Sequence, residues 1–288
     1  MLYWSIMMRI KQLDKMLAIV LLVLVFLSAV FLRPKLNQTS YVQSTIPTLF
    51  FHGYGSSANA EKHMTQAARK AGVTQTIIRA NVDTEGQVTL LGEIPTGAIN
   101  PIVEVNYQDN RNADYHQDAR YAKAVVMKLQ ETYGFREINM VGHSMGNMSI
   151  LFYLLDYAHE QNLPQLQKVV HIANHVNGLE GRDLPADPSL DEQTGQPKKM
   201  STSYQELLAL RDRYPKQQID VLNVYGDLEG QSDGSVLNVS SKSLKYLVSE
   251  RATSYTEERI TGKGAQHSQL HENPEVDRLL LDFLWGVN

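Results

Sequence analysis

The sequence of 288 residues contains no cysteine. This absence excludes disulfide bonds, thiolate metal sites, thiol nucleophiles and a lipid-modified N-terminal cysteine. A chain of this length can bury one core that is stable without cross-links, so the missing cysteine does not identify the compartment.

Basic runs long enough to bind nucleic acid are missing as well. The 27 basic and 31 acidic residues give a formal net charge of −4 at pH 7, and 43% of the residues are hydrophobic. This balance is that of an ordinary globular protein and argues against nucleic acid as a partner. The length fits one large α/β domain with a short appendage.

One long hydrophobic run, Met16 to Leu32, lies near the N-terminus. It holds no charged residue, follows the basic residues Arg9, Lys11 and Lys15, and reaches the lower length limit of a membrane-spanning helix. We therefore predict a signal anchor over residues 1–32 that crosses the cell membrane once and leaves the rest of the chain outside. A cleaved signal peptide, which would release a secreted protein, is the alternative.

After the anchor, we expect a polar linker over residues 33–46 and one domain over residues 47–288. Strand-like and helical segments alternate in the domain, which predicts a mostly parallel sheet with helices on both faces. We predict strands at 48–52, 76–80, 88–91, 102–106, 138–141, 169–173 and 219–225, and helices at 58–71, 113–133, 145–159 and 274–284.

Residues 175–200 are rich in Gly, Pro, Asp and Gln and poor in hydrophobic residues. The segment is too long for an ordinary connection, which makes it a candidate lid or cap insertion. A surface loop without a role is the alternative.

The segment Gly142-His143-Ser144-Met145-Gly146 fits the pattern G-x-S-x-G between a predicted strand and a predicted helix. Such a turn is so tight that side chains larger than hydrogen two residues from the serine would collide. The turn also places the serine hydroxyl at the N-terminus of a helix, where a developing negative charge is stabilised. Ser144 is therefore the candidate nucleophile.

A serine hydroxyl needs a histidine to accept its proton and a carboxylate to orient that histidine. Two histidines lie far enough downstream of Ser144 to accept its proton: His267, directly after a flexible loop, and His271, nearer the last helix. We favour His267. The candidate acids are Asp227 and Asp233, which both follow the predicted strand 219–225, and 34 residues from Asp233 to His267 leave room for a helix and a strand.

The oxyanion of a tetrahedral intermediate needs two N–H donors. A strand-turn-helix with the serine at the turn is called a nucleophile elbow. In such an elbow the residue after the nucleophile, here Met145, supplies one N–H donor. The glycine-rich turn His52-Gly53-Tyr54-Gly55 follows a predicted strand, and we assign the second donor to the N–H of Tyr54.

The segments HGYGSS, GHSMGN, SDGSV and HSQLHENPEV, in this order and spacing, resemble the lipase-type α/β hydrolases. More narrowly, they are similar to a group of Gram-positive bacterial proteins described as cell-surface hydrolases or as a domain of unknown function. The resemblance covers residue 47 to the C-terminus and implies a triad of Ser144, Asp233 and His267. It favours Asp233 over Asp227, because secreted lipase-like members place the acid in an Asp-Gly-x-Val segment. It does not identify a substrate.

The expected activity is hydrolysis of a small or lipid-like ester through an acyl-enzyme. Acyl transfer or peptide cleavage by the same triad, and a binding module without activity, are the alternatives. We expect no metal, because His171 and His175 lie in or beside a predicted strand and would not share one helical face. No cofactor is expected, since no phosphate-binding glycine loop is present. The sequence does not reveal the oligomeric state.

Overall fold

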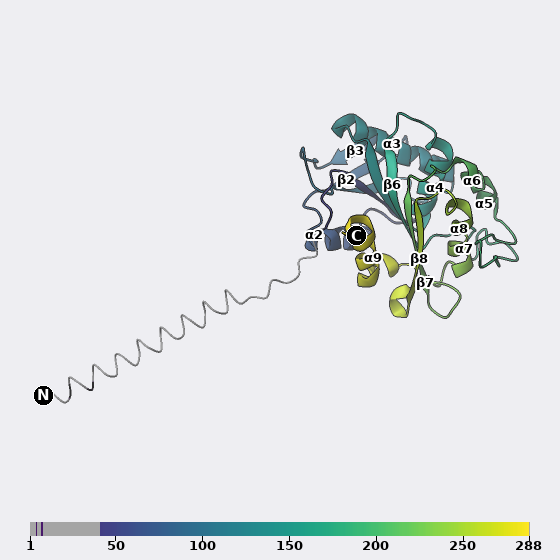
Figure 1. Cartoon of the computed structure of the whole chain (residues 1–288). Coiled ribbons are helices and arrows are strands. Elements are labelled where there is room, and N and C mark those ends of the chain that lie inside the picture. The colour runs from purple at the N-terminus through teal and green to yellow at the C-terminus, as the bar shows by residue number, and fades with distance from the viewer. Residues whose placement is uncertain (1–3, 5–6, 8–40, 288) are drawn as a thin grey trace. The chain divides into compact units, whose positions relative to one another are not determined.

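A twisted sheet forms the centre of the computed structural model, which describes Trp4, Met7 and residues 41–287 (Figure 1). Within the described residues the sheet has eight strands in the order β3-β2-β4-β1-β5-β6-β7-β8. All neighbouring strands pair in parallel except β2 and β3, which are antiparallel. The strands are β1 (Thr48–Phe51), β2 (Ile77–Val82), β3 (Val88–Leu91), β4 (Ile102–Tyr107), β5 (Glu137–His143), β6 (Gln165–Ile172), β7 (Asp220–Asp227) and β8 (Ser254–Thr261).

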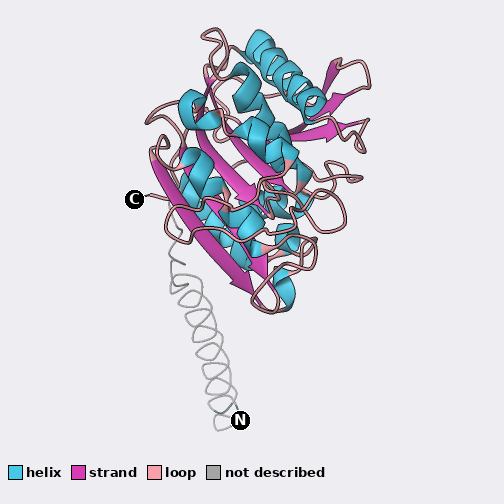
Figure 2. Ribbon diagram, turned by 90° about the vertical axis from the view of Figure 1, so that its right-hand side faces the viewer, coloured by secondary structure: helices cyan, strands magenta, loops and turns pink. Residues whose placement is uncertain are grey.

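Helices cover both faces of this sheet (Figure 2). On one face lie α2 (Lys62–Lys70) and α9 (Pro274–Trp285), whose hydrophobic side chains form one core cluster. On the other face lie α3 (Tyr115–Tyr133), α4 (Met145–Tyr157), α5 (Thr202–Leu207), α6 (Leu210–Arg213), α7 (Asn238–Lys242) and α8 (Leu244–Val248). Strand β1 serves both clusters, because successive side chains of a strand point to opposite faces: Leu49 and Phe51 to one, Phe50 to the other.

Helix ends follow the capping signals in the sequence. The Asp114 side chain accepts hydrogen bonds from the backbone N–H groups of His116 and Gln117 and so begins α3. The same helix ends at Gly134, whose φ of 75° is a left-handed conformation that glycine adopts without strain. Pro274 opens α9, with Asn273 as its cap.

The predicted mostly parallel sheet with helices on both faces is confirmed, with shifts at the ends of elements. Helix α2 begins at Lys62 rather than at residue 58, because residues 58–61 form turns. The predictions gave no bounds for α5 to α8, which have four to six residues each, too few to show a helical period. The sequence also predicts no bounds for β8, because this edge strand is rich in polar residues and shows no hydrophobic pattern.

The predicted signal anchor over residues 1–32 lies almost wholly outside the described residues. Among the residues that the structure does describe, no helix has the length and hydrophobicity to cross a bilayer. The end of the predicted linker is described, and it packs against the domain. The Val42 N–H donates to the Trp285 carbonyl, and the Ser44 N–H donates to the Asn100 side chain.

Residues 175–200, the candidate lid, form turns and one short antiparallel bridge between Leu190 and Pro197. The segment contacts α7 and α8 through an ion pair between Glu192 and Lys242 and a hydrogen bond of 2.8 Å from Lys245 Nζ to the Gln193 carbonyl.

Candidate active site

Ser144 stands on a sharp turn between β5 and α4, with φ of 53° and ψ of −119°. This positive φ is costly for a residue with a side chain, and it is retained where the surroundings hold the backbone in place. The flanking glycines are required by the packing. A Cβ at Gly146 would lie 2.2 Å from the Phe51 carbonyl oxygen, and one at Gly142 would lie 2.8 Å from Asn147. The elbow therefore packs directly on β1.

Asn147, in the first turn of α4, ties the elbow to β6. Its fully buried side-chain amide donates to the carbonyls of Ser144 and Ile172, at 2.9 and 2.8 Å. Its side-chain oxygen lies 3.1 Å from Nδ1 of His171. Sequence reasoning gave Asn147 no role, although its position directly after the elbow glycine was a usable signal.

His267 connects Ser144 to Asp233. Its Nε2 lies 2.9 Å from Ser144 Oγ, and its Nδ1 lies 2.7 Å from Asp233 Oδ2. Because a carboxylate can only accept, Nδ1 carries the proton and Nε2 accepts a hydrogen bond from the serine hydroxyl. The three residues lie in the segments that follow β5, β7 and β8, at the carboxyl ends of these parallel strands. The structure thus brings together the three residues that the sequence analysis chose.

Asp233 is held by its own turn and is only 2% exposed. Its Oδ1 accepts hydrogen bonds from the N–H groups of Ser235 and Val236, at 2.9 and 2.8 Å, and its carbonyl accepts one from the His267 N–H. Gly226, at the end of β7, makes this approach feasible, since a Cβ there would lie 2.9 Å from the Asp233 Cβ. The need for glycine at this position was not foreseen.

The rival residues lie elsewhere. Asp227 Oδ1 accepts a hydrogen bond from the Gly230 N–H, and its Oδ2 lies 3.4 Å from an Arg259 guanidinium nitrogen, so it shapes the turn after β7. The His271 ring packs edge-on against His143, with centroids 4.7 Å apart. Neither is hydrogen-bonded to Ser144 or His267.

His143, the residue before Ser144, packs against His267. It is buried, its Nε2 lies 3.0 Å from the His267 carbonyl oxygen, and the two ring centroids are 5.2 Å apart. Burial, and to a lesser degree the nearby His267, hold the pKa of His143 well below its usual range. His143 is therefore neutral and donates from Nε2 to that carbonyl.

The proposed oxyanion donors, Tyr54 and Met145, belong to the loop after β1 and to the first residue of α4. Within the described residues, neither backbone N–H donates to another protein group. The loop touches the elbow, because a Cβ at Gly53 would lie 3.1 Å from the Ser144 Cβ. Both N–H groups thus lack a protein acceptor among the described residues and belong to segments that border Ser144.

His52 orients this loop and was not singled out from the sequence. Its Nε2 accepts a hydrogen bond from the Tyr107 N–H at 3.1 Å, so Nδ1 carries the proton and donates to the Gly53 carbonyl at 2.9 Å. The carbonyl of Gly53 and the N–H of Tyr54 belong to one peptide plane and point in opposite directions. The bond from His52 therefore turns the Tyr54 N–H away from His52.

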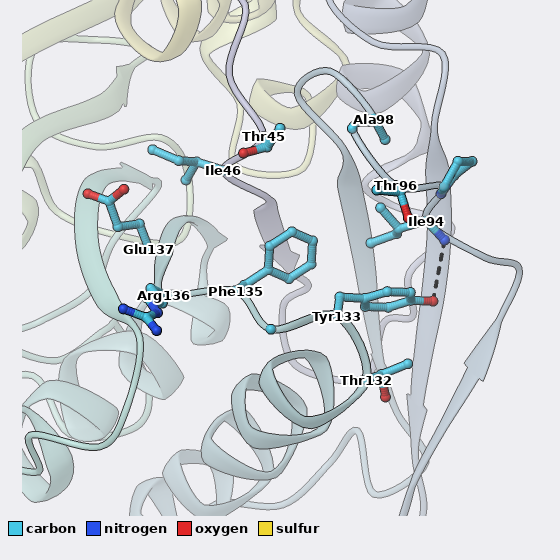
Figure 3. Close-up of a pocket in the computed structure, with 13 residues that line it drawn as sticks. Thr45, Ile46, Ile94, Thr96, Ala98, Thr132, Tyr133, Phe135, Arg136 and Glu137 are labelled. Atoms are coloured by element: carbon cyan, nitrogen blue, oxygen red, sulfur yellow. Dashed lines mark hydrogen bonds between the residues drawn. The ribbon is translucent and has the colours of Figure 1, made fainter.

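A cavity of about 480 Å³ lies near the amino ends of the strands, opposite to the end that carries the candidate active site (Figure 3). Its lining residues precede β1, β4 and β5, whereas Ser144, Asp233 and His267 follow their strands. A hydrogen bond from the Ile94 N–H to the Tyr133 hydroxyl closes one side. This cavity has no contact with the candidate active site. Across the described residues, no three His, Asp or Glu side chains converge as a metal site requires.

The family described as "Alpha/beta hydrolase of unknown function (DUF915)" matches residues 35–287. No curated protein matches the sequence. Among solved structures, the product of the gene lin2722 of Listeria innocua is 25% identical, with a TM-score of 0.75 over 84% of this chain and 94% of that one. A protein from Lactobacillus plantarum, described as a cell-surface hydrolase, is 20% identical, with a TM-score of 0.66 over 82% and 88% of the two chains.

Proposed function

The chain belongs to this DUF915 family of α/β hydrolases, and on that premise we propose that it is a serine hydrolase that cleaves carboxylic esters. The proposal is carried by one observation: a continuous hydrogen-bonded series from Ser144 Oγ through His267 to Asp233. An α/β-hydrolase fold with this series has the parts that acyl transfer requires.

In the proposed reaction, Ser144 Oγ attacks the acyl carbon while His267 Nε2 takes the hydroxyl proton. His267 then gives that proton to the leaving alcohol, and an acyl-enzyme remains on Ser144. Water, deprotonated by the same histidine, releases the acid. Asp233 holds the histidine tautomer and stabilises the imidazolium that forms.

The N–H groups of Tyr54 and Met145 would hold the oxyanion of each tetrahedral intermediate. Each such donor contributes on the order of 10² to 10³ in turnover. Their lack of other protein acceptors among the described residues favours this role.

The test compares the full-length wild-type chain with Ser144→Ala on p-nitrophenyl esters from acetate to palmitate. We expect the alanine variant to lose turnover by about 10⁶-fold, because no other group attacks the carbonyl. Ser268→Ala, which changes an exposed serine beside His267, is the matched control and should retain activity. If Ser144→Ala remained as active as wild type, the proposal would be wrong. If the wild type cleaved no ester and Ser144 did not react with a fluorophosphonate, an inactive binding module would be favoured.

We also propose that the hydrophobic run from Met16 to Leu32 anchors the enzyme in the cell membrane with the domain outside. The support for this location is the sequence alone.

A further inference from the structure

Two arginines lie close to the Tyr54 side chain. The guanidinium carbons of Arg111 and Arg182 lie 5.9 and 5.7 Å from the Tyr54 ring centroid. Arg182 is also 6.0 Å from the ring of Tyr115. Tyr54 and the two arginines are exposed residues, and Tyr54 is 48% exposed. Two positive charges therefore lie beside the side chain of the residue whose N–H is the proposed oxyanion donor.

Neither guanidinium is neutralised by a partner. Within the described residues, no carboxylate lies within 4.0 Å of Arg111 or Arg182, and neither side chain makes a hydrogen bond. By contrast, five other arginines of the described residues each pair with an acid at 2.9 to 3.5 Å.

Four acids in the neighbouring segments form no ion pair with Arg111 or Arg182 within the described residues. Asp183 accepts a hydrogen bond from the Leu179 N–H, and Asp114 caps α3 and lies 3.5 Å from Arg120. Burial raises the pKa of Asp118 to about 7, with Arg182 acting in the opposite direction. Asp109 is half-buried in the loop before Arg111 and has no ion pair within the described part of the chain. A free anion would thus find donors of the two guanidiniums unoccupied.

The loop that carries Arg111 is fastened to the oxyanion loop. The Gly55 N–H donates to the Asn110 carbonyl, and the Asn110 side chain donates to the Ser56 carbonyl, both at 2.6 Å. Gly55 has φ of 66°, and a Cβ there would lie 3.5 Å from the Arg111 guanidinium. Arg182 comes from the segment 175–200, the candidate lid. That segment therefore contributes a charged group to the rim of the candidate active site.

We propose that the ester substrate carries an anionic group, a carboxylate or phosphate, which Arg111 and Arg182 bind beside the reacting carbonyl. The planar guanidinium has paired donors that match both anions. This inference rests on the proposed esterase function and adds the substrate class. The charge can lie on the acyl side or on the alcohol side of the ester, and the test separates these two cases.

Three esters with closely matched leaving groups provide the test: phenyl butyrate, monophenyl glutarate with an acyl-side carboxylate, and 3-carboxyphenyl butyrate with an alcohol-side carboxylate. We expect wild type to prefer one anionic ester over phenyl butyrate by about tenfold in kcat/KM, since exposed charge pairs contribute modestly. The double variant R111Q/R182Q should lose this preference, and added NaCl should weaken it in wild type. Arg278→Gln, an exposed arginine on α9, is the control and should keep it.

A preference that the double variant retains would overturn the proposal, and so would equal rates on all three esters in wild type. A second measurement does not depend on catalysis: calorimetric titration of monoethyl glutarate and of ethyl butyrate into the Ser144→Ala chain. If monoethyl glutarate binds to the Ser144→Ala chain and this binding is lost with R111Q/R182Q, the inference is supported. If in addition wild type cleaves no ester, only the esterase proposal fails. Cleavage of phenyl butyrate without arginine-dependent binding or preference refutes the inference and leaves the esterase proposal standing.

Discussion

Asp233 and Asp227 both follow β7, but their side chains meet different partners. Asp233 Oδ2 lies 2.7 Å from His267, whereas Asp227 pairs with Arg259 at 3.4 Å. The sequence predicts both residues as candidate acids, because each follows the same predicted strand. The choice between them from the residues alone rested on spacing, since the conformation of the turn that directs each carboxylate depends on contacts such as that of Gly226.

Replacing Asp233 with asparagine tests the assignment of Asp233 as the acid that orients His267. An asparagine whose nitrogen faced Nδ1 would put two donors together, so the imidazole would favour the tautomer with its proton on Nε2, which cannot accept from Ser144. We expect kcat to fall by about 10⁴-fold with little change in KM. Asp227→Asn is the matched control and should cost less than about tenfold. A larger loss in Asp227→Asn than in Asp233→Asn would reverse the assignment.

Strand β6 and helix α4 are joined by a buried polar contact between His171 and Asn147. Burial lowers the pKa of His171 from 6.5 to about 3, so the folded protein keeps this histidine neutral. The unfolded chain binds a proton there below pH 6.5 and the folded chain does not. Stability from this group is therefore present above pH 6.5 and is lost as the pH falls toward 3.

His171→Asn removes this titration. We expect the free energy of unfolding of wild type, relative to that of the variant, to fall by about 2 kcal/mol between pH 7 and pH 5. Urea unfolding of both proteins at each pH measures it. His159→Asn, which changes an exposed histidine in the turn after α4, is the control and should show a smaller relative change. A difference between wild type and His171→Asn that stays constant with pH would contradict a buried neutral His171.

At the scale of the whole molecule, residues 41–287 form the hydrolase fold, while the proposed membrane anchor precedes them. Expressed in bacterial cells, the full chain should stay in the membrane pellet after an alkaline carbonate wash. A chain that starts at Arg33 should be released, because the hydrophobic run is gone. Recovery of the full chain in the wash, at its full mass, would refute the anchor. Recovery of a shortened chain in the medium would favour a cleaved signal peptide.

Sequence patterns alone predict the alternation of strands and helices, the turn around Ser144 and the candidates His267 and Asp233. These are local signals: hydrophobic period, a glycine pattern required by a tight turn, and chain order. The folded chain shows which acid faces the histidine, that Asn147 holds the turn around Ser144, that His143 contacts His267 and that His52 orients the Tyr54 peptide. It also brought Arg111 and Arg182 to one aromatic ring from positions 71 residues apart, the difference of their numbers. Contacts between distant segments depend on how the strands pair and how the loops pack, which no local pattern contains.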